Sequence, residues 1–367
     1  MMKKRLISLI LAGAMVLGMA GCAKKPGESD DKKGDKGGYE LALITDVGTI
    51  DDKSFNQGSW EGLKKYADEK DISCKYYKPS EKSDKACLTA IDLAVKGGAK
   101  VVVTPGFLFE KPIFEAQTKY PDVTFIIIDA APIGEDKKPH IEKNVLSIFY
   151  AEEQAGYLAG YAAVKEGYKQ LGFMGGIAVP AVIRYGYGFV QGADAAAKEL
   201  GLAKDAIDIK YTYVGNFDAS PENQTKAAAW YSEGTECIFA CGGGVGNSVM
   251  KAAEGAGKKV IGVDVDQSVE SDTVITSAMK KLNDSVYNAV ASYYDKSFEG
   301  GKSITLSAAD DGVQLPMETS KFEKFTKEEY EKVYSGLKDG SIKIANDTAA
   351  KDAKDLPTSV VKVESIK

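Results

Sequence analysis

Histidine is almost absent from this sequence, since His140 is the one histidine among 367 residues. Acid–base catalysis by histidine and most zinc sites draw on clustered His or Cys side chains, so the sequence disfavours both. His140 lies in a Pro-flanked polar segment and is interpreted as a surface residue. The net charge of −6 lacks the basic excess of a nucleic-acid-binding protein. We therefore expect no catalytic residue, no metal, no cofactor and no nucleic-acid partner.

Glycine motifs that bind phosphate are missing as well. The run CGGGVGNSV at 241–249 lacks the Gly-Lys-Ser/Thr ending of a P-loop, and its glycines miss the G-x-G-x-x-G register. The glycines at 186 and 188 miss that register too, because the third falls at 192 and not at 191. We therefore do not expect a site for nucleotide phosphates.

The cysteine spacing does not require a disulfide. Cys237 and Cys241 fall in one predicted strand, where an offset of four residues spans roughly 13 Å, too far for a bridge. Cys74 and Cys87 flank a loop and could pair, but nothing in the sequence demands it. We interpret these four cysteines as small residues that suit a core.

The first 22 residues have a basic start, an apolar stretch from Leu6 to about Met19, and small residues before Cys22. The apolar stretch is short for a membrane span. Met19-Ala20-Gly21-Cys22 resembles a bacterial lipobox, although Met19 replaces the usual Leu, and this implies that Cys22 is lipidated. The alternative is an ordinary secretory signal. Residues 23–38 are polar and are predicted to form a tether with a reach of about 20–25 Å.

From Tyr39 onward, apolar runs alternate with amphipathic segments, which is typical of an α/β protein with parallel sheets. Two such series follow each other and exceed what one sheet needs, so we predict two similar lobes. Gly156, Gly160 and Ala163 share a helix face that permits close packing. The predicted strands are 41–44, 73–77, 101–104, 123–129, 170–174, 209–214, 237–241 and 259–263. The predicted helices include 84–96, 109–119, 150–166, 186–199, 221–231, 248–256 and one with a capping box at 326–329.

The stretch 41–60 combines a buried strand, a polar loop and the start of a helix. Ser54 is a candidate cap for this helix, which we expect to bury Trp60, Leu63 and Ala67. Phe55 points about 140° away from that face at 100° per residue. In open α/β sheets, ligands bind outside the carboxyl ends of the strands. The sequence therefore places Phe55 at a candidate ligand site.

Three apolar strands end at aspartates, namely Asp46, Asp129 and Asp264. Each one alone is explained as a helix cap or a turn residue, but strand ends of a parallel sheet share one edge, so together they indicate a polar cleft. Gly244 and its neighbouring glycines would let backbone N–H groups approach a ligand there. Several carboxylates repel phosphate and accept hydrogen bonds from hydroxyl, amino or imino groups, at about 1.5–3 kcal/mol each. A sugar or a nucleoside is thereby favoured.

Two aromatic residues just after strand ends, Phe55 and Phe217, suit a planar ligand. Stacking on an aromatic side chain is worth roughly 1–3 kcal/mol per base, and two stacks with several charged hydrogen bonds support a dissociation constant of about 1 μM or below. Lys280 is a candidate positive partner for the carboxylates. The alternatives are core packing for the two Phe rings and a solvated helix position for Lys280.

An ordered set of motifs resembles the basic membrane protein family of lipoproteins, which serve as substrate-binding components of ABC importers. The motifs are D-V-G-x-x-D-D-K-S-F-N-Q at 46–57, I-I-I-D at 126–129, E-x-x-A-G-Y-L-A-G at 152–160, G-G-x-x-x-P at 175–180, G-F-V-x-G at 188–192, G-V-D-x-D-Q at 262–267 and T-S-x-x-K at 276–280. The resemblance runs from about residue 40 to 345. It implies a type I periplasmic-binding-protein fold, with two Rossmann-like lobes joined by a multi-strand hinge and a nucleoside closed between them.

The resemblance also assigns roles to individual residues. It implies stacking by Phe55 and Phe217 and reading of the base by Asn56 and Asp129. It implies ribose contacts from Asp46, Asp264, Lys280 and the backbone near Gly244. The stretch 181–187 could not be matched to residues of the family.

The implied lobe boundaries are 39–149 with about 270–306 for the first lobe, and 150–269 with about 307–345 for the second. Residues 346–367 are left as a polar C-terminal tail.

We expect a monomeric receptor, anchored by lipid on the extracytoplasmic face of the cell membrane, that delivers its ligand to ABC permease and ATPase subunits. Asp129 favours a purine nucleoside such as guanosine, inosine or adenosine. The alternatives are a sensor that binds a sugar or another small molecule, and a nucleoside-processing enzyme.

Overall fold

The computed structural model describes residues 38–46 and 48–366. The predicted signal peptide, Cys22 and all of the predicted tether except residue 38 lie outside the described residues. Within the described part, no helix has both the length and the apolar character needed to cross a membrane. The four described cysteines, Cys74, Cys87, Cys237 and Cys241, are free thiols.

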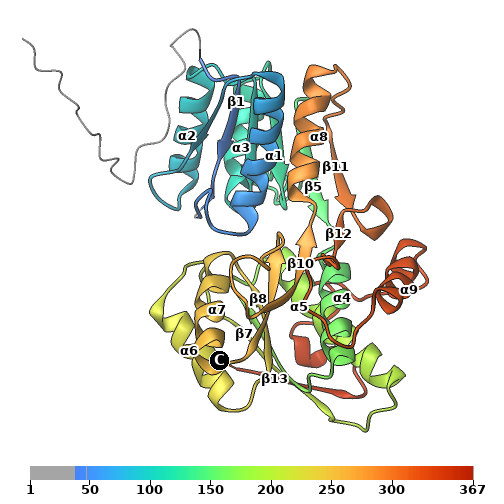
Figure 1. The fold of residues 1–367 in the computed structure, drawn as a ribbon. Coiled ribbons are helices and arrows are strands. Elements are labelled where there is room, and N and C mark those ends of the chain that lie inside the picture. Colours follow the sequence, from blue (N-terminus) through green and yellow to red (C-terminus); the bar gives the residue numbers. More distant parts are fainter. Residues whose placement is uncertain (1–37, 47, 367) are drawn as a thin grey trace, which may run out of the picture. The chain divides into compact units, whose positions relative to one another are not determined.

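The first lobe is built on a parallel sheet of six strands in the order β11-β5-β4-β3-β1-β2 (Figure 1). The strands are β1 (Leu41–Ile44), β2 (Cys74–Tyr77), β3 (Val101–Pro105), β4 (Thr124–Ile128), β5 (Val145–Tyr150) and β11 (Lys302–Leu306). The helices are α1 (Phe55–Lys70), α2 (Asp84–Lys96), the short η1 (Phe107–Phe109), α3 (Glu110–Lys119) and α8 (Leu282–Tyr294).

Successive side chains of β1 face opposite helix layers. Leu41 and Leu43 pack in the cluster that contains the inner faces of α1 and α8, whereas Ala42 and Ile44 pack with α2 and α3. Because both faces of the strand are buried, the sequence there is continuously apolar. This continuity explains why the strand was predictable.

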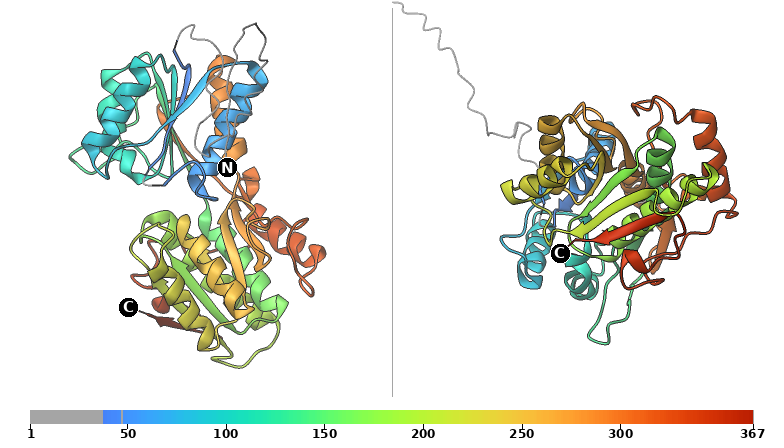
Figure 2. Two further views of the ribbon diagram at one scale, coloured as in Figure 1. Left: turned by 60° about the vertical axis from the view of Figure 1, so that its left-hand side comes forward. Right: turned by 90° about the horizontal axis from the view of Figure 1, so that it is seen from below.

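The second lobe has a sheet of seven strands in the order β12-β10-β9-β8-β6-β7-β13, parallel except for β12. The strands are β6 (Gln170–Gly175), β7 (Ile207–Tyr213), β8 (Cys237–Cys241), β9 (Lys259–Asp264), β10 (Val274–Lys280), β12 (Val313–Gln314) and β13 (Val361–Ser365). The helices are α4 (Glu152–Glu166), α5 (Pro180–Glu199), α6 (Pro221–Ser232), α7 (Gly244–Ala256), α9 (Lys327–Lys338) and the short η2 (Ala308–Asp310) and η3 (Ala353–Asp355). Figure 2 shows helices on both faces of this sheet.

Close packing of α4 against α5 confirms the predicted role of the small residues. A Cβ atom on Gly156 would lie 2.1 Å from the Tyr185 carbonyl oxygen, and one on Gly160 would lie 2.0 Å from that of Phe189. No side chain fits at these distances, so glycine is required on this face.

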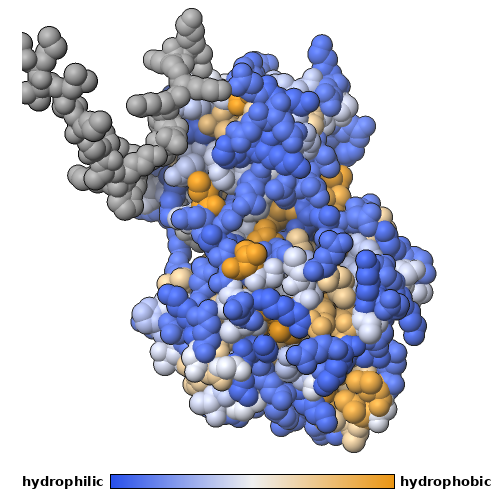
Figure 3. Space-filling model, viewed as in Figure 1, coloured by the Kyte–Doolittle hydropathy of each residue, from blue (hydrophilic) through white to orange (hydrophobic). Residues whose placement is uncertain are grey.

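The chain crosses between the two lobes three times in the described residues, after β5, after β10 and after β11. The crossings are hydrogen-bonded to one another, since the Ala151 N–H donates to the Leu306 carbonyl at 3.0 Å and the Lys281 N–H donates to that of Gly312 at 2.9 Å. These segments form the multi-strand hinge. On the face shown in Figure 3, most of the surface is hydrophilic, and apolar side chains emerge between the lobes.

Several details differ from the predictions. Strand β5 was not predicted, and α7 begins at Gly244, four residues before the predicted start at 248. Strand β10 lies within the segment 270–306 predicted for the first lobe, but it pairs with β9 and β12 of the second sheet, so the chain returns to the first lobe only at α8. Strand β13 lies within the predicted tail and extends the second sheet by pairing with β7. Helix α5 begins at Pro180, six residues before the predicted start at 186, because proline is well suited to a first helical turn.

Candidate functional site

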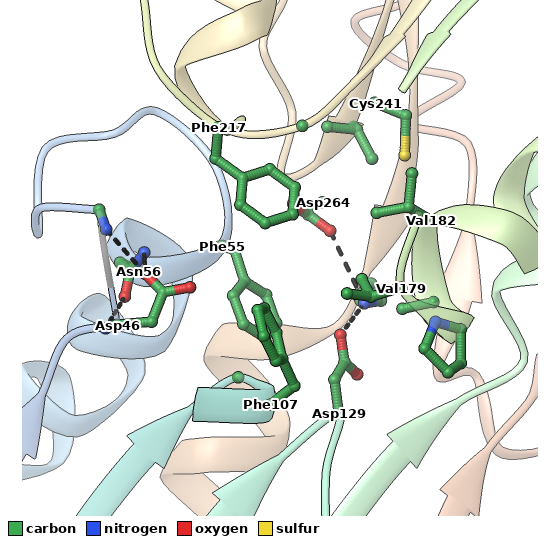
Figure 4. A pocket seen from close by; sticks show the side chains of 18 of the residues that line it. Asp46, Phe55, Asn56, Phe107, Asp129, Val179, Val182, Phe217, Cys241 and Asp264 are labelled. Atoms are coloured by element: carbon green, nitrogen blue, oxygen red, sulfur yellow. Dashed lines mark hydrogen bonds and ion pairs between the residues drawn. The ribbon is translucent and has the colours of Figure 1, made fainter. Parts of the chain in front are cut away.

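A cavity of about 280 Å³ lies between the lobes, at the carboxyl ends of strands from both sheets (Figure 4). This volume is near the lower end for small-molecule sites. All eight residues predicted to bind the ligand line it, namely Asp46, Phe55, Asn56, Asp129, Phe217, Gly244, Asp264 and Lys280. The structure therefore brings together side chains that are more than two hundred positions apart in the sequence.

The aspartates reach the cavity because of where their strands end. Asp129 follows β4 directly, and Asp264 is the last residue of β9. Both adopt left-handed backbone conformations, with φ of 58° and 66°. Such conformations are uncommon for residues other than glycine, although Asp tolerates them, and they are concentrated at functional sites.

The two predicted aromatic residues come from different lobes. Phe55 is the first residue of α1, and Phe217 lies in the loop after β7. The ring of Phe217 is seated against the backbone of Gly176, where a Cβ atom would lie 2.3 Å from the ring. In Figure 4 both rings border the same space, with Phe107 beside Phe55. Core packing away from a cavity is thus excluded for both.

The glycine run at the start of α7 supports Phe217. The N–H of Gly244 donates to the Phe217 carbonyl at 3.0 Å, and the N–H groups of Val245 and Gly246 donate to Gly242 and Gly243. Gly244 lines the cavity, but its N–H is already used within the chain. The expected backbone donor at Gly244 is therefore not free in this structure.

At one end of the cavity, Asn56 joins two carboxylates. Its amide nitrogen donates to Asp46 Oδ1 at 2.9 Å and to Asp52 Oδ2 at 2.8 Å, and its oxygen accepts the Asp46 N–H at 3.2 Å. Both amide hydrogens are thereby used, so Asn56 positions the carboxylates and has no free donor for a base. Burial raises the pKa of Asp46 above its ordinary value, against the hydrogen bonds from Gly48 and Asn56.

Helix α1 is capped by Asp52, not by Ser54 as predicted. The Asp52 carboxylate accepts the N–H groups of Ser54, Asn56 and Gln57 at 2.9–3.1 Å. The Ser54 hydroxyl instead donates to Asp264 Oδ2 at 2.6 Å. Since Asp264 belongs to the second lobe, Ser54 links the two lobes.

At the other end of the cavity, Lys280 is the centre of a buried ion cluster. It is 3% exposed at the end of β10, which excludes the solvated helix position considered for it. Its ammonium group contacts Asp129 Oδ2 and lies 3.1 Å from Glu152 Oε1 and 3.9 Å from Asp264 Oδ1. Arg184 Nε in turn donates to Glu152 Oε2 at 2.5 Å.

The charges of this cluster shift one another's pKa values. Burial raises the pKa of Asp129 to about 7, although the Lys280 ammonium opposes the shift. Burial also acts to raise the pKa of Glu152, but Lys280 and Arg184 outweigh it and hold that pKa low. Burial lowers the basicity of Lys280, yet the three carboxylates around it raise its pKa overall. The cluster therefore stays charged at Lys280 and Glu152, whereas burial raises the pKa values of both Asp129 and Asp264.

Asp129 Oδ1 is buried and has no hydrogen-bond partner in the protein. An unpaired buried acceptor is costly, so native structures usually give it a partner. Asp129 lines the cavity, so its carboxylate is a candidate acceptor for a ligand.

Sequence reasoning missed several residues of the site. Glu152 resembles the acidic residue that often begins a helix, and Arg184 lies in the stretch 181–187 that could not be matched. Tyr185 and Phe107 line the cavity, and the Lys280 ammonium lies 5.4 Å from the ring centre of Tyr185 and 5.1 Å from that of Phe55. Phe107 follows the Thr-Pro-Gly end of β3, and that position was the available signal for it.

The whole arrangement suits an uncharged ligand that has a flat ring and several N–H or O–H donors. Carboxylates outnumber cations around the cavity, and the aromatic rings offer stacking faces. Within the described residues, no group of three or more His, Cys, Asp or Glu side chains is arranged to hold a metal ion.

Comparisons with known proteins agree on one family. The family described as "ABC transporter substrate-binding protein PnrA-like" matches residues 39–349. The "ABC transporter nucleoside-binding protein BmpA" of Lactococcus lactis subsp. cremoris is 29% identical over 94% of this chain and 99% of that protein. "Basic membrane protein D" of Borreliella burgdorferi is 28% identical over 88% of this chain and 92% of its own length.

Solved structures show the same fold. An ABC transporter solute-binding protein from Aeropyrum pernix K1 has a TM-score of 0.72 and 21% identity, covering 86% of this chain and 94% of its own. An ABC transporter solute-binding protein from Conexibacter woesei has a TM-score of 0.66 and 21% identity. The match covers 84% of this chain and 99% of that chain. The type I periplasmic-binding-protein fold is thereby confirmed. With its match across residues 39–349, the chain belongs to the Bmp family of PnrA-like ABC transporter substrate-binding proteins.

Proposed function

We propose that this substrate-binding protein captures a purine nucleoside between its lobes. The observation that carries the proposal is the Asp129 carboxylate, one oxygen of which has no partner in the protein, on the wall of a cavity that Phe55 and Phe217 also line. A purine base fits between two aromatic rings, and its edge offers the N–H donors that a buried carboxylate lacks. The Lactococcus relative is named as a nucleoside-binding protein, which supports the same ligand class.

The energies of these contacts are sufficient for tight binding. Stacking contributes roughly 1–3 kcal/mol per aromatic contact. Each hydrogen bond to a charged acceptor contributes about 1.5–3 kcal/mol. After the costs of ordering the ligand and the lobes, a dissociation constant of about 1 μM or below follows.

Asp129 gives the site its preference among bases. As a carboxylate it accepts the imino and amino N–H groups of guanosine, or the imino N–H of inosine. Adenosine offers an amino N–H and a ring nitrogen that accepts. We therefore rank guanosine and inosine first and adenosine next, with ribose contacts from Asp46, Asp264 and Lys280.

The remaining parts of the proposal concern location and partners. A lipid on Cys22 and the tether 23–38 would hold the receptor on the extracytoplasmic face of the membrane. There the monomer would present its closed form to the permease of an ABC importer, which an ATPase drives. No enzymatic step is part of this function.

Isothermal titration of the purified protein tests the ligand class. Guanosine or inosine should bind with a dissociation constant of about 1 μM or below, while ribose and the free base bind far more weakly because each satisfies one part of the cavity. Binding of a sugar or an amino acid, with none of the three purine nucleosides, would refute the proposal. Release of free base from inosine on prolonged incubation would indicate an enzyme instead.

A further inference from the structure

One contact joins the two lobes directly without lining the cavity. The side-chain amide of Gln267, in the connection between β9 and β10, donates to the backbone carbonyl of Lys53 at 2.6 Å. Lys53 precedes α1 in the first lobe, and neither residue belongs to the cavity wall. The bond therefore needs no ligand to form.

The second lobe holds Gln267 in a fixed position. The side chain of Gln267 is fully buried, and its Oε1 accepts the Val263 N–H at 2.9 Å. The backbone N–H of Gln267 donates to Ser277 Oγ at 3.0 Å. A Cβ atom on Gly262 would lie 2.5 Å from Gln267 Oε1, so a side chain at position 262 would displace the Gln267 amide. The amide nitrogen is thus aimed across the gap between the lobes by its own lobe.

The first lobe also holds the acceptor, the Lys53 carbonyl, in a fixed position. Lys53 has a left-handed backbone with φ of 62°, and its N–H donates to Gln57 Oε1 at 3.1 Å. Asp52, directly before it, caps α1. The Lys53 ammonium adds an outer link, at 3.5 Å from Glu270 Oε1. Donor and acceptor are therefore each held by contacts within their own lobe.

We infer that Gln267 is a positioning residue that acts as a latch between the lobes and stabilises the closed arrangement independently of the ligand. The inference deepens the proposed function and rests on it. When the lobes separate, this bond breaks and the amide exchanges its protein partner for water. Because only the closed arrangement contacts both faces of the ligand, a larger closed fraction in the free protein raises the apparent affinity in proportion.

The test compares Gln267→Met with a matched variant, Gln117→Met. Gln117 is also buried and also bonds to backbone through both ends of its amide, to His140 and Glu142, but entirely within the first lobe. Small-angle X-ray scattering of the ligand-free proteins should show a larger radius of gyration for Gln267→Met than for wild type. The radius of gyration of Gln117→Met should equal that of wild type.

Binding and release of inosine provide the second measurement. Loss of the latch should raise the dissociation constant about tenfold, mostly through faster release in rapid-mixing experiments. A saturating concentration of inosine should restore the wild-type radius. Should Gln267→Met fail to fold, Gln267→Asn, one methylene shorter and unable to reach Lys53, carries the same expectation.

An unchanged radius and affinity in a folded Gln267 variant would overturn the latch. So would equal losses of affinity in the Gln267 and Gln117 variants, because that would indicate a general effect of a buried glutamine. The scattering measurement needs no ligand. A failure of inosine to bind wild type would therefore refute the proposed function while leaving the latch to be decided by the radius alone.

Discussion

The two ends of the cavity differ in whether their buried polar groups have partners within the protein. At the Asp46 end, Asn56 and the two carboxylates that it joins satisfy one another. At the Asp129 end, Lys280 contacts three carboxylates, and one oxygen of Asp129 is left without a partner. The polar groups of the first end are satisfied within the protein, and under the proposed function the ligand would complete the second end. Discrimination between ligands should therefore depend on Asp129. The Asp46 end should set the shape of the cavity.

The largest expected effect comes from removing the cation of the ion cluster. Lys280→Met leaves buried carboxylates without their partner, and breaking a buried pair costs about 3–5 kcal/mol. Thermal unfolding should show a large loss of stability together with the loss of nucleoside binding. The neighbouring Lys281 forms an exposed pair with Asp284, so Lys281→Met should leave both properties near wild type. Comparable behaviour of the two variants would contradict the buried role of Lys280.

The aromatic rings should account for the next largest effect. Phe55→Ala removes a stacking face worth roughly 1–3 kcal/mol, so nucleoside affinity should fall at least tenfold without unfolding of the protein. Phe217→Ala should lower nucleoside affinity similarly, because the Phe217 ring provides the second stacking face, from the other lobe. Phe322, partly buried against Phe325 and outside the cavity wall, provides the control substitution to Ala. Native circular dichroism with unchanged affinity in Phe55→Ala would count against stacking.

Asp129→Ala tests the open end of the cavity directly. Loss of the charged acceptor should weaken guanosine binding at least tenfold in calorimetry, and should narrow the difference between guanosine and adenosine. Asp92, which pairs with Lys119 on the outside of the first lobe, is a suitable control. If the two nucleosides keep their wild-type ratio, another residue reads the base.

The pH dependence of binding sharpens the same comparison. Because burial raises the pKa of Asp129 to about 7, its carboxylate becomes protonated as the pH falls through 7, and an acceptor is lost. Guanosine affinity should thus fall by up to about tenfold per pH unit below 7. Adenosine affinity should fall less, because its ring nitrogen can accept a hydrogen bond from the protonated Asp129 carboxyl group. In Asp129→Asn the guanosine profile should become flat. An equally steep profile in that variant would assign the titration to another group.

The smallest effect on affinity is expected from Asn56→Ala. This change breaks the link between Asp46 and Asp52 and should reduce the free energy of unfolding by about 1–3 kcal/mol. Because the Asn56 amide hydrogens are not free for a ligand, affinity should change only severalfold. A loss as large as that of Asp129→Ala would show that both ends of the cavity select the base.

The sequence predicted those parts of the site that depend on local pattern. Apolar runs that end in Asp mark strand ends, and Phe55 and Phe217 follow strands closely enough to be placed at the cavity. Glu152 was missed because an acidic residue at a helix start has a common local explanation. Nothing local distinguishes it from a residue that pairs with Lys280, which is 128 positions away.

The fold likewise has parts that follow from local sequence pattern and parts that depend on contacts between distant segments. The eight predicted strands are present in the structure, but β5 was not predicted. Strands β10 and β13 belong to the second sheet through pairings that the chain pattern does not encode. The internal hydrogen bonds of Asn56 and Gly244 were likewise beyond sequence reasoning, because they depend on the partners that folding brings within reach.

The position of the ion cluster has a mechanical consequence. Lys280 ends the strand before one interlobe crossing, and Glu152 begins the helix after another, so both charges sit close to the pivot about which the lobes turn. Displacement grows with distance from a pivot, so a swing that moves the rim by a large arc shifts these two groups very little. Opening of the lobes would therefore shift the Lys280–Glu152 ion pair little, whereas Asp129 of the first lobe would move relative to it.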